Sequence, residues 1–290
     1  MTSDVELVVD LHAQLAEAPW WDEEHRQLVF VDIVAGMLYR YRPEDGDLTA
    51  RDIGEPVGAA LPRAQGDVVL ALGSGLALWD EHGEHRIVCP IEADRPDNRL
   101  NDAKCDAAGR LWVGSMAKDT TAGAGSLYCV TPDYTCRRVL SDVSISNGMD
   151  WTDDNTLMYY NDSRTHRVDL FDFDLDTGAL SGRRPFVELA ADEGEPDGLT
   201  LDAEGGVWIA TFGGGTVRRY RPDGTLDAVL RVPARKVTSL AFGGRDRDEL
   251  YITTAAIDLD AEERSRYPSA GGVFRCRPGV RGRPPHAFRG

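Results

Sequence analysis

Short runs of apolar or alternating residues, separated by polar turns, follow one another along the whole chain. Long helical periodicity is almost absent, and the runs come in pairs, as expected for antiparallel strands joined by turns. The turns are rich in Gly and Asp, which tolerate a positive φ or bond their own backbone. The predicted pairs are residues 28–33 with 38–42, 68–72 with 76–81, 110–116 with 126–131, 157–162 with 167–174, 207–212 with 217–221, and 250–254 with 272–277.

The pairs repeat with a constant phase, because one anchor residue precedes the turn into each pair and successive anchors are 40 to 50 residues apart. This is the period of a four-stranded propeller blade, roughly 40–50 residues. The anchors are Glu17, Val57, Asn101, Asn147, Asp197 and Thr238. The repeat therefore predicts an all-β fold, a six-bladed β-propeller of four-stranded antiparallel blades, with residues 1–290 as a single domain. A β-sandwich, the main alternative, has no fixed long period.

Three segments stand outside the repeat. Residues 5–10 form a spare strand that we expect to join the C-terminal blade and close the ring. Residues 118–125 (KDTTAGAG) interrupt the third pair, and they fit either a mobile flap over the channel mouth or an ordinary surface loop. Residues 257–270 form a second insertion, with a helical turn predicted at 260–263.

Composition narrows the class of protein. The chain has 49 acidic against 32 basic residues, a net charge of −17, so nucleic acid is not an expected partner. Its five cysteines include no CxxC pair, which favours a reducing cytoplasm over a disulfide framework. The first residues lack a signal-peptide pattern, and no apolar run approaches the roughly 20 residues of a membrane helix. We therefore expect a cytoplasmic monomer or weak homodimer with no membrane partner.

The anchors Glu17, Asn101, Asn147 and Asp197 are polar and occupy the phase of the repeat that faces the channel. The first strands of propeller blades line the axis, so these side chains are expected to meet there. The carboxylates of Glu17 and Asp197 with the amide of Asn147 form an all-oxygen set that suits Ca²⁺, Mg²⁺ or Mn²⁺. The alternative is that the Asn-Gly and Asp-Gly pairs beginning at positions 147 and 197 are turn dipeptides without a ligand.

Other catalytic patterns are missing from the sequence. The six histidines show no HExxH spacing, and no G-x-S-x-G nucleophile elbow is present. The glycines at 213–215 fit a hairpin turn and not a phosphate-binding loop. Metal-assisted chemistry is therefore the simplest enzymatic interpretation.

Eight segments resemble, in order along the chain, motifs of the SMP-30/regucalcin/gluconolactonase family. They are residues 98–104 (NRLNDAK), 106–116 (DAAGRLWVGSM), 145–151 (ISNGMDW), 159–163 (YYNDS), 196–198 (PDG), 202–208 (DAEGGVW), 238–244 (TSLAFGG) and 270–274 (AGGVF). The resemblance implies a six-bladed propeller with one divalent metal, in a family many of whose members hydrolyse sugar lactones.

Carried over position by position, the resemblance implies metal ligands at Glu17, Asn147 and Asp197. It also implies that Arg99 and Asn101 bind hydroxyl or carbonyl oxygens of a substrate. The cofactor expected first is one Ca²⁺ ion, with Zn²⁺, Mn²⁺, Mg²⁺ or Fe²⁺ as alternatives.

The expected function is hydrolysis of a sugar (aldono)lactone to the aldonic acid, with the metal as Lewis acid and an activated water. Asp197 is the candidate catalytic base, Arg99 would orient the substrate, and Asp102 would steady Arg99 or the water. Relatives carry an acidic substrate contact in a longer loop, for which Asp119 is the nearest match here. The alternatives are a hydrolase of other lactones or phosphotriesters, and a calcium-binding regulatory or interaction propeller without turnover.

Overall fold

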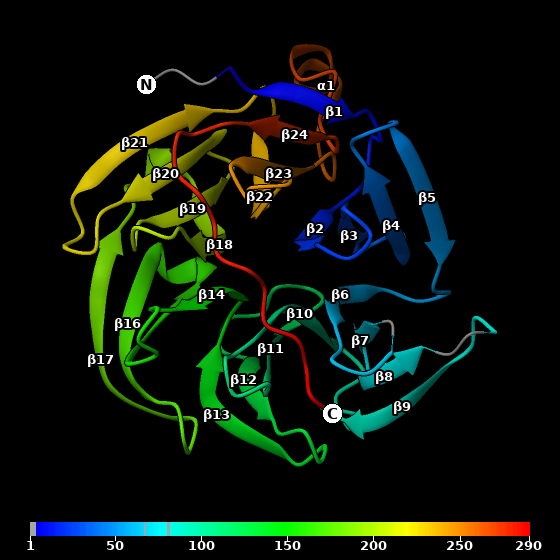
Figure 1. The fold of residues 1–290 in the computed structure, drawn as a ribbon, viewed down its shortest axis with the longest axis vertical. Coiled ribbons are helices and arrows are strands. Elements are labelled where there is room, and N and C mark those ends of the chain that lie inside the picture. The colour runs from blue at the N-terminus through cyan, green and yellow to red at the C-terminus, as the bar shows by residue number, and fades with distance from the viewer. Residues whose placement is uncertain (1–3, 67, 80–81) are drawn as a thin grey trace.

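Most of the chain folds into β-strands that surround a central axis (Figure 1). The computed structural model describes residues 4–66, 68–79 and 82–290. The strands form antiparallel sheets, most of them four-stranded. This confirms the prediction of an all-β architecture built from four-stranded antiparallel sheets.

Within the described ranges, four sheets contain four strands each, in chain order. They hold β2 (Ala16–Asp22), β3 (Gln27–Asp32), β4 (Met37–Arg42) and β5 (Asp47–Asp52); β6 (Val57–Pro62), β7 (Val68–Leu72), β8 (Gly75–Trp79) and β9 (His85–Pro90); β10 (Asn98–Cys105), β11 (Leu111–Ala117), β12 (Gly125–Val130) and β13 (Cys136–Val143); and β14 (Ser146–Trp151), β15 (Leu157–Asp162), β16 (Arg167–Asp174) and β17 (Ala179–Glu188). The last two positions of the predicted strand 76–81, and position 67, lie outside the described residues.

The remaining strands form one eight-stranded sheet in the order β1-β24-β23-β22-β19-β20-β21, with β18 paired to β19. Its two halves are joined through one residue pair, Phe212 with Lys236. The separate sheets among the described strands are therefore five and not the predicted six. The strands are β1 (Glu6–Val9), β18 (Glu195–Leu201), β19 (Val207–Phe212), β20 (Thr216–Tyr220), β21 (Leu226–Arg231), β22 (Lys236–Gly243), β23 (Glu249–Ala255) and β24 (Val273–Cys276).

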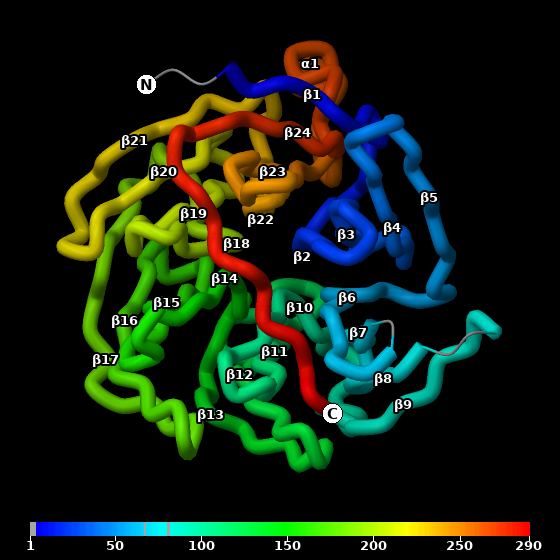
Figure 2. Tube along the Cα trace, viewed as in Figure 1, coloured from blue at the N-terminus to red at the C-terminus, as the bar shows by residue number. Residues whose placement is uncertain are grey.

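The two ends of the chain complete the ring. Strand β1 pairs antiparallel with β24, as the spare N-terminal strand predicts, and Glu6 accepts a hydrogen bond from Arg275 at 2.6 Å. The predicted helical turn is also confirmed, because α1 (Ala261–Arg266) begins after Asp260, whose side chain accepts from the backbone of Glu263. After β24 the chain crosses the front of the ring to end near β9 (Figure 2).

Each innermost strand has a β-bulge at its anchor residue. The pairing with the next strand shifts between Glu17 and Trp20 in β2, Val57 and Ala59 in β6, Leu100 and Ala103 in β10, Ser146 and Met149 in β14, Pro196 and Leu199 in β18, and Val237 and Ser239 in β22. A bulge bends the strand and re-aims a side chain. The constant phase of the sequence repeat therefore corresponds to one repeated backbone feature.

Two of the glycines that follow anchor residues, those of the Asn-Gly and Asp-Gly pairs, lie inside strands and not in turns. Gly148 lies in β14, and a Cβ there would stand 2.5 Å from the backbone oxygen of Asp197. Gly198 lies in β18, and a Cβ there would stand 2.1 Å from Oγ of Ser239. Glycine is required because neighbouring inner strands approach closely, so the turn-dipeptide interpretation is wrong.

Two of the sequence motifs have the same structural basis. The indole N–H groups of Trp112 and Trp208 each donate to a buried carboxylate 2.8 Å away, on Asp106 and Asp202 respectively. Each aspartate opens a turn and also accepts from the backbone of that turn. The Asp and Trp of these motifs therefore fix the turn against the core of the blade.

Two further expectations concern cysteines and membranes. All five cysteines are free thiols. Within the part of the chain that the structure describes, no helix has the length and apolar character that a membrane crossing requires.

Candidate functional site

Three anchor residues lie together at the bulges of β2, β14 and β18. The side chains of Glu17, Asn147 and Asp197 are buried, each residue being 4% exposed. The carboxyl groups of Glu17 and Asp197 share a hydrogen bond, and the glycine after Asn147 packs on the backbone of Asp197. The structure therefore brings the three predicted ligands into one cluster.

The two carboxyl groups are electrostatically costly in this position. Burial first, and then the charge of Asp102, raise the pKa of Glu17 to about 8. Burial and the charge of Glu17 raise the pKa of Asp197 well above its usual value. Two buried carboxylates that contact each other repel unless a proton or a cation lies between them.

The buried oxygen atoms of the cluster are incompletely satisfied. Oδ1 of Asn147 and Oδ1 of Asp197 have no hydrogen-bond partner among the described residues. Nδ2 of Asn147 donates to Oγ of Ser163 at 3.0 Å, which fixes the amide so that its oxygen is left for another partner. Glu17 accepts from the backbone of Ala18 through Oε2 at 2.8 Å. Unpaired buried oxygens of this kind are rare, and a hard divalent cation is a partner that fits them.

No group of three or more His, Cys, Asp and Glu side chains within residues 4–66, 68–79 and 82–290 is arranged to hold a metal ion. The predicted set differs from such groups because its third ligand is the amide of Asn147. Its chemistry is that of an oxygen-only site with places left for water or substrate.

Arg99 and Asn101 lie beside the cluster and bind each other. Nη1 of Arg99 donates to Oδ1 of Asn101 at 2.6 Å, and Nδ2 of Asn101 donates to the backbone oxygen of Ser146 at 2.8 Å. Burial lowers the pKa of Arg99 to about 10, while Glu17 and Asp197 act in the opposite direction. Arg99 therefore remains a cation at neutral pH, and Asn101 positions it. Direct contact of either residue with a substrate stays a prediction.

Asp119 lies on the loop between β11 and β12 and forms no part of the buried oxygen cluster. Its side chain is exposed and accepts from the backbone N–H and the hydroxyl of Thr121, at 2.9 and 2.7 Å. These hydrogen bonds lower the pKa of Asp119. In this structure Asp119 stabilises its own turn, and its role in substrate binding stays a prediction.

Asp102 binds its own strand, β10, instead of steadying Arg99, while its role toward a water stays a prediction. Its Oδ1 accepts from the backbone of Ala103 at 2.8 Å, while Asn101 is the residue that holds Arg99. Burial raises the pKa of Asp102 to about 6, although the charge of Lys104 lowers it. Asp102 therefore contributes negative charge that raises the pKa of both Glu17 and Asp197.

Ser163 is a residue of the candidate site that sequence reasoning missed. It orients the Asn147 amide from η1 (Ser163–Thr165), the turn after β15. In the sequence, Ser163 stands out only as the last residue of the YYNDS motif, and that motif does not predict its hydrogen bond to Asn147. Only the fold shows that this serine faces Asn147 from 16 residues away in sequence.

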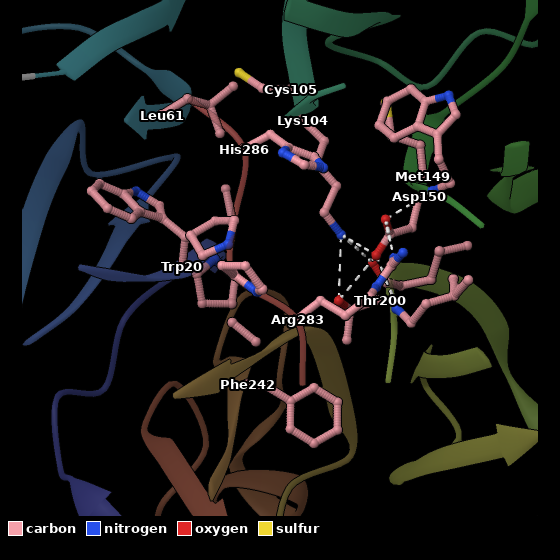
Figure 3. A pocket seen from close by; sticks show the side chains of 18 of the residues that line it. Trp20, Leu61, Lys104, Cys105, Met149, Asp150, Thr200, Phe242, Arg283 and His286 are labelled. Carbon is pink, nitrogen blue, oxygen red and sulfur yellow. Dashed lines mark hydrogen bonds and ion pairs between the residues drawn. The ribbon is translucent and has the colours of Figure 1, made fainter. Parts of the chain in front are cut away.

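A cavity of about 220 Å³ lies between the innermost strands (Figure 3). Asp102 and Lys104 line it, but Glu17, Asn147 and Asp197 do not. Residues 283–286 of the C-terminal segment form part of its wall. The cavity is therefore lined by neighbours of the oxygen cluster, such as Asp102, and not by its three oxygen-bearing residues.

The ring of antiparallel sheets, with polar side chains gathered at bulges near its axis, defines a β-propeller-like protein. The pattern of the SMP-30/Gluconolactonase/LRE-like region matches residues 15–256 of the sequence. The chain therefore belongs to the SMP-30/gluconolactonase/LRE-like family.

Individual relatives extend over nearly the whole chain. Regucalcin of Gallus gallus is 38% identical over 295 residues, which covers 99% of this chain and 98% of the relative. A calcium-binding protein, regucalcin, of Agrobacterium tumefaciens has a TM-score of 0.95 at 28% identity, covering 100% of this chain and 98% of that one. A luciferin-regenerating enzyme has a TM-score of 0.93 at 32% identity and covers 99% of both chains.

Proposed function

We propose that this chain is a metal-dependent lactonase that opens a sugar (aldono)lactone to the aldonic acid. The observation that carries the proposal is the pair of buried, unpartnered oxygens on Asn147 and Asp197, beside the carboxyl group of Glu17 and the guanidinium of Arg99. Membership of a family whose description includes gluconolactonase supports the same reaction.

The proposal includes a six-bladed architecture. The eight-stranded sheet counts as two blades, because β18 and β22 each carry the bulge that marks an innermost strand. The single pair between Phe212 and Lys236 is then a contact between neighbouring blades.

Glu17, Asn147 and Asp197 would hold the cation. Ca²⁺ is the first candidate because the three ligands are oxygens and a relative of similar fold is named a calcium-binding protein. Zn²⁺, Mn²⁺, Mg²⁺ and Fe²⁺ are the alternatives. When bound, a divalent cation would supply Lewis-acid polarisation of the lactone carbonyl.

The side chains around the cation would divide the remaining work. Arg99 donates hydrogen bonds to substrate oxygens and is itself held by Asn101. Asp197 takes a proton from the attacking water while the oxygen of that water bonds to the carbonyl carbon of the lactone. The bond from that carbon to the ring oxygen breaks, and the proton passes to the ring oxygen, which leaves as a hydroxyl group. The products are the free acid and the alcohol of one opened chain.

The test is an assay of acid release from several aldonolactones by metal-stripped protein, with Ca²⁺, Mg²⁺, Mn²⁺, Zn²⁺ and Fe²⁺ added back in turn. We expect activity to return with at least one ion. Loss of activity in Asp197→Asn with the ion still bound supports the assigned base, and full activity in that variant rejects it. Absence of hydrolysis with every ion and every lactone rejects the proposed function.

A second candidate is a calcium-binding regulatory or interaction propeller without turnover, which the name of the Agrobacterium relative favours. It predicts Ca²⁺ binding in calorimetry with no lactone hydrolysed. Arg99 favours the enzyme, because a positive charge beside Glu17 and Asp197 weakens metal binding, and a site that only stores calcium gains nothing from that charge. Hydrolysis of other lactones or of phosphotriesters is separated from the main proposal by a substrate panel.

A further inference from the structure

The loop between β11 and β12, residues 118–124, is tied to the segment that precedes β10. The backbone oxygen of Ala124 accepts from Nδ2 of Asn98 at 2.9 Å and from Nη1 of Arg95 at 3.1 Å. At the other end of the loop, Nζ of Lys118 donates to the backbone oxygen of Pro96 at 2.7 Å. These contacts fix both ends of the loop on one side.

Arg164 holds the middle of the loop from the other side. Its Nη2 donates to Oγ1 of Thr120 at 3.1 Å, and its Nη1 forms an ion pair with Oε1 of Glu195 at 3.0 Å. Thr120 belongs to the loop, while Glu195 begins β18, the strand that carries Asp197. Arg164 therefore bridges two parts of the rim that are far apart in sequence.

The position of Arg164 links this bridge to the oxygen cluster. It follows Ser163 in η1, and Ser163 is the residue that orients the Asn147 amide. In η1, the side chain of Ser163 therefore binds a proposed metal ligand, and the side chain of Arg164 binds the loop. The bridge therefore lies on the same side of the ring as the cluster.

Thr120 has a backbone conformation that needs support. Its φ is +61°, in the left-handed region, where a β-branched residue is uncommon. Its N–H donates to the backbone oxygen of Ala117 at 2.9 Å, and its hydroxyl binds Arg164. Strained residues persist where the surroundings over-determine them, and they occur often at ligand sites.

We propose that Arg164 is a specificity-determining residue, which clamps residues 118–124 against Glu195 and restricts the site to compact monocyclic lactones. The proposal rests on the lactonase function proposed above. A lactone with a fused or pendant aromatic ring would have to displace the loop, breaking the bonds of Arg164 to Thr120 and Glu195. A small polyhydroxylated lactone would enter without this cost.

The test combines hydrogen exchange with kinetics on the full chain. In Arg164→Gln we expect amide exchange across residues 118–124 to rise by at least about threefold, because the bridge is lost. We also expect the ratio of kcat/KM for dihydrocoumarin to that for a six-membered aldonolactone to rise by about fivefold or more. Thr120→Val, which keeps the ion pair with Glu195 but removes the hydroxyl, should shift both quantities in the same direction.

Two variants serve as matched controls. Thr120→Ser retains a hydroxyl for Arg164, and Arg184→Gln removes a similarly exposed arginine whose partner is Asp172, on β16. Both should leave the exchange of the loop and the substrate ratio as in the parent protein.

Each contrary result has a definite meaning. Unchanged loop exchange in Arg164→Gln overturns the clamp, whether or not any lactone is hydrolysed. Faster exchange with an unchanged substrate ratio overturns the role in specificity. If the parent protein hydrolyses no lactone with any metal, the proposed function fails and the specificity role fails with it, while the exchange data still decide the clamp.

Discussion

Nη2 of Arg283 donates a hydrogen bond to Oδ1 of Asp150 at 2.9 Å, although 133 residues separate them in the sequence. Asp150 belongs to the inner strand β14, and Arg283 to the C-terminal segment that crosses the ring. Lys104 and Thr200 reach the other oxygen of the same carboxylate, as Figure 3 shows. One carboxylate therefore fastens the C-terminal segment to the channel wall.

Asp150→Asn should destabilise the fold in a pH-dependent way. Burial raises the pKa of Asp150, but Lys104 and Arg283 outweigh it and hold the pKa at about 2, below its usual 3.8. The stabilisation is therefore fully present above pH 3.8 and is lost as the pH falls toward 2. The difference in unfolding free energy between parent and variant should be about 3 kcal/mol at pH 5. It should shrink by roughly 1 kcal/mol between pH 5 and pH 3.

Denaturant unfolding at pH 5, 4 and 3 measures this difference. Asp153→Asn, at an exposed position in the turn after β14, is the control and should differ from the parent by less than about 0.5 kcal/mol at each pH. A difference between parent and Asp150→Asn that stays constant over this range would contradict the assignment.

Ser163→Ala should weaken cation binding by roughly tenfold or more, because the Asn147 amide loses the partner that fixes its orientation. Calorimetric titration of metal-stripped protein with Ca²⁺ measures the change. Ser141→Ala removes an exposed hydroxyl from β13 and should bind as the parent does. Equal affinities for Ser163→Ala and the parent would show that the amide is oriented by something else.

Asn101→Ala should lower kcat/KM by about tenfold to a hundredfold, because Arg99 loses the acceptor that holds it. Calcium affinity should change much less, since Asn101 is not among the three proposed ligands. Steady-state kinetics and calorimetry on the same preparation separate the two effects. A large loss of calcium affinity with unchanged kcat at saturating metal would assign Asn101 to metal binding.

Gly148→Ala should cost about 1–3 kcal/mol of unfolding free energy, because the added Cβ meets the backbone of Asp197 at 2.5 Å. It should also reduce cation affinity, since relief of the clash moves β14 or β18. Gly73→Ala is the matched control, because the nearest atom to its Cβ would be a side-chain oxygen 3.9 Å away. Thermal unfolding with and without Ca²⁺ tests both effects, and a Gly148→Ala protein as stable as the control would be inconsistent with the close approach.

Local patterns were sufficient to predict the two middle strands of the four-stranded sheets. The predicted strands 157–162 and 167–174 coincide with β15 and β16, because apolar runs bounded by turn residues are a local signal. Outer strands such as β5 carry little of this signal, since nearly all of their residues are exposed. Joining of β19 to β22 depends on how neighbouring sheets meet, which a repeat does not encode.

The candidate site was likewise predictable from the sequence only in part. The phase of the repeat predicted that Glu17, Asn147 and Asp197 lie together, because each lies at the equivalent bulge of its own innermost strand. Contacts made by neighbouring side chains were not predictable, as Ser163 and Arg164 show. Their partners come from other strands and loops, so the contacts exist only once the ring is closed.

The six bulges also have an evolutionary consequence. Three of the six equivalent positions, Val57, Asn101 and Thr238, supply no metal ligand in the proposed site, and Thr238 is engaged with the backbone of Ala16. The backbone at these places is already bent as it is beside Glu17. Single substitutions there can change the charge and number of donors while the scaffold stays the same. Descendants of this fold could thereby acquire new metals or new substrates by point mutation alone.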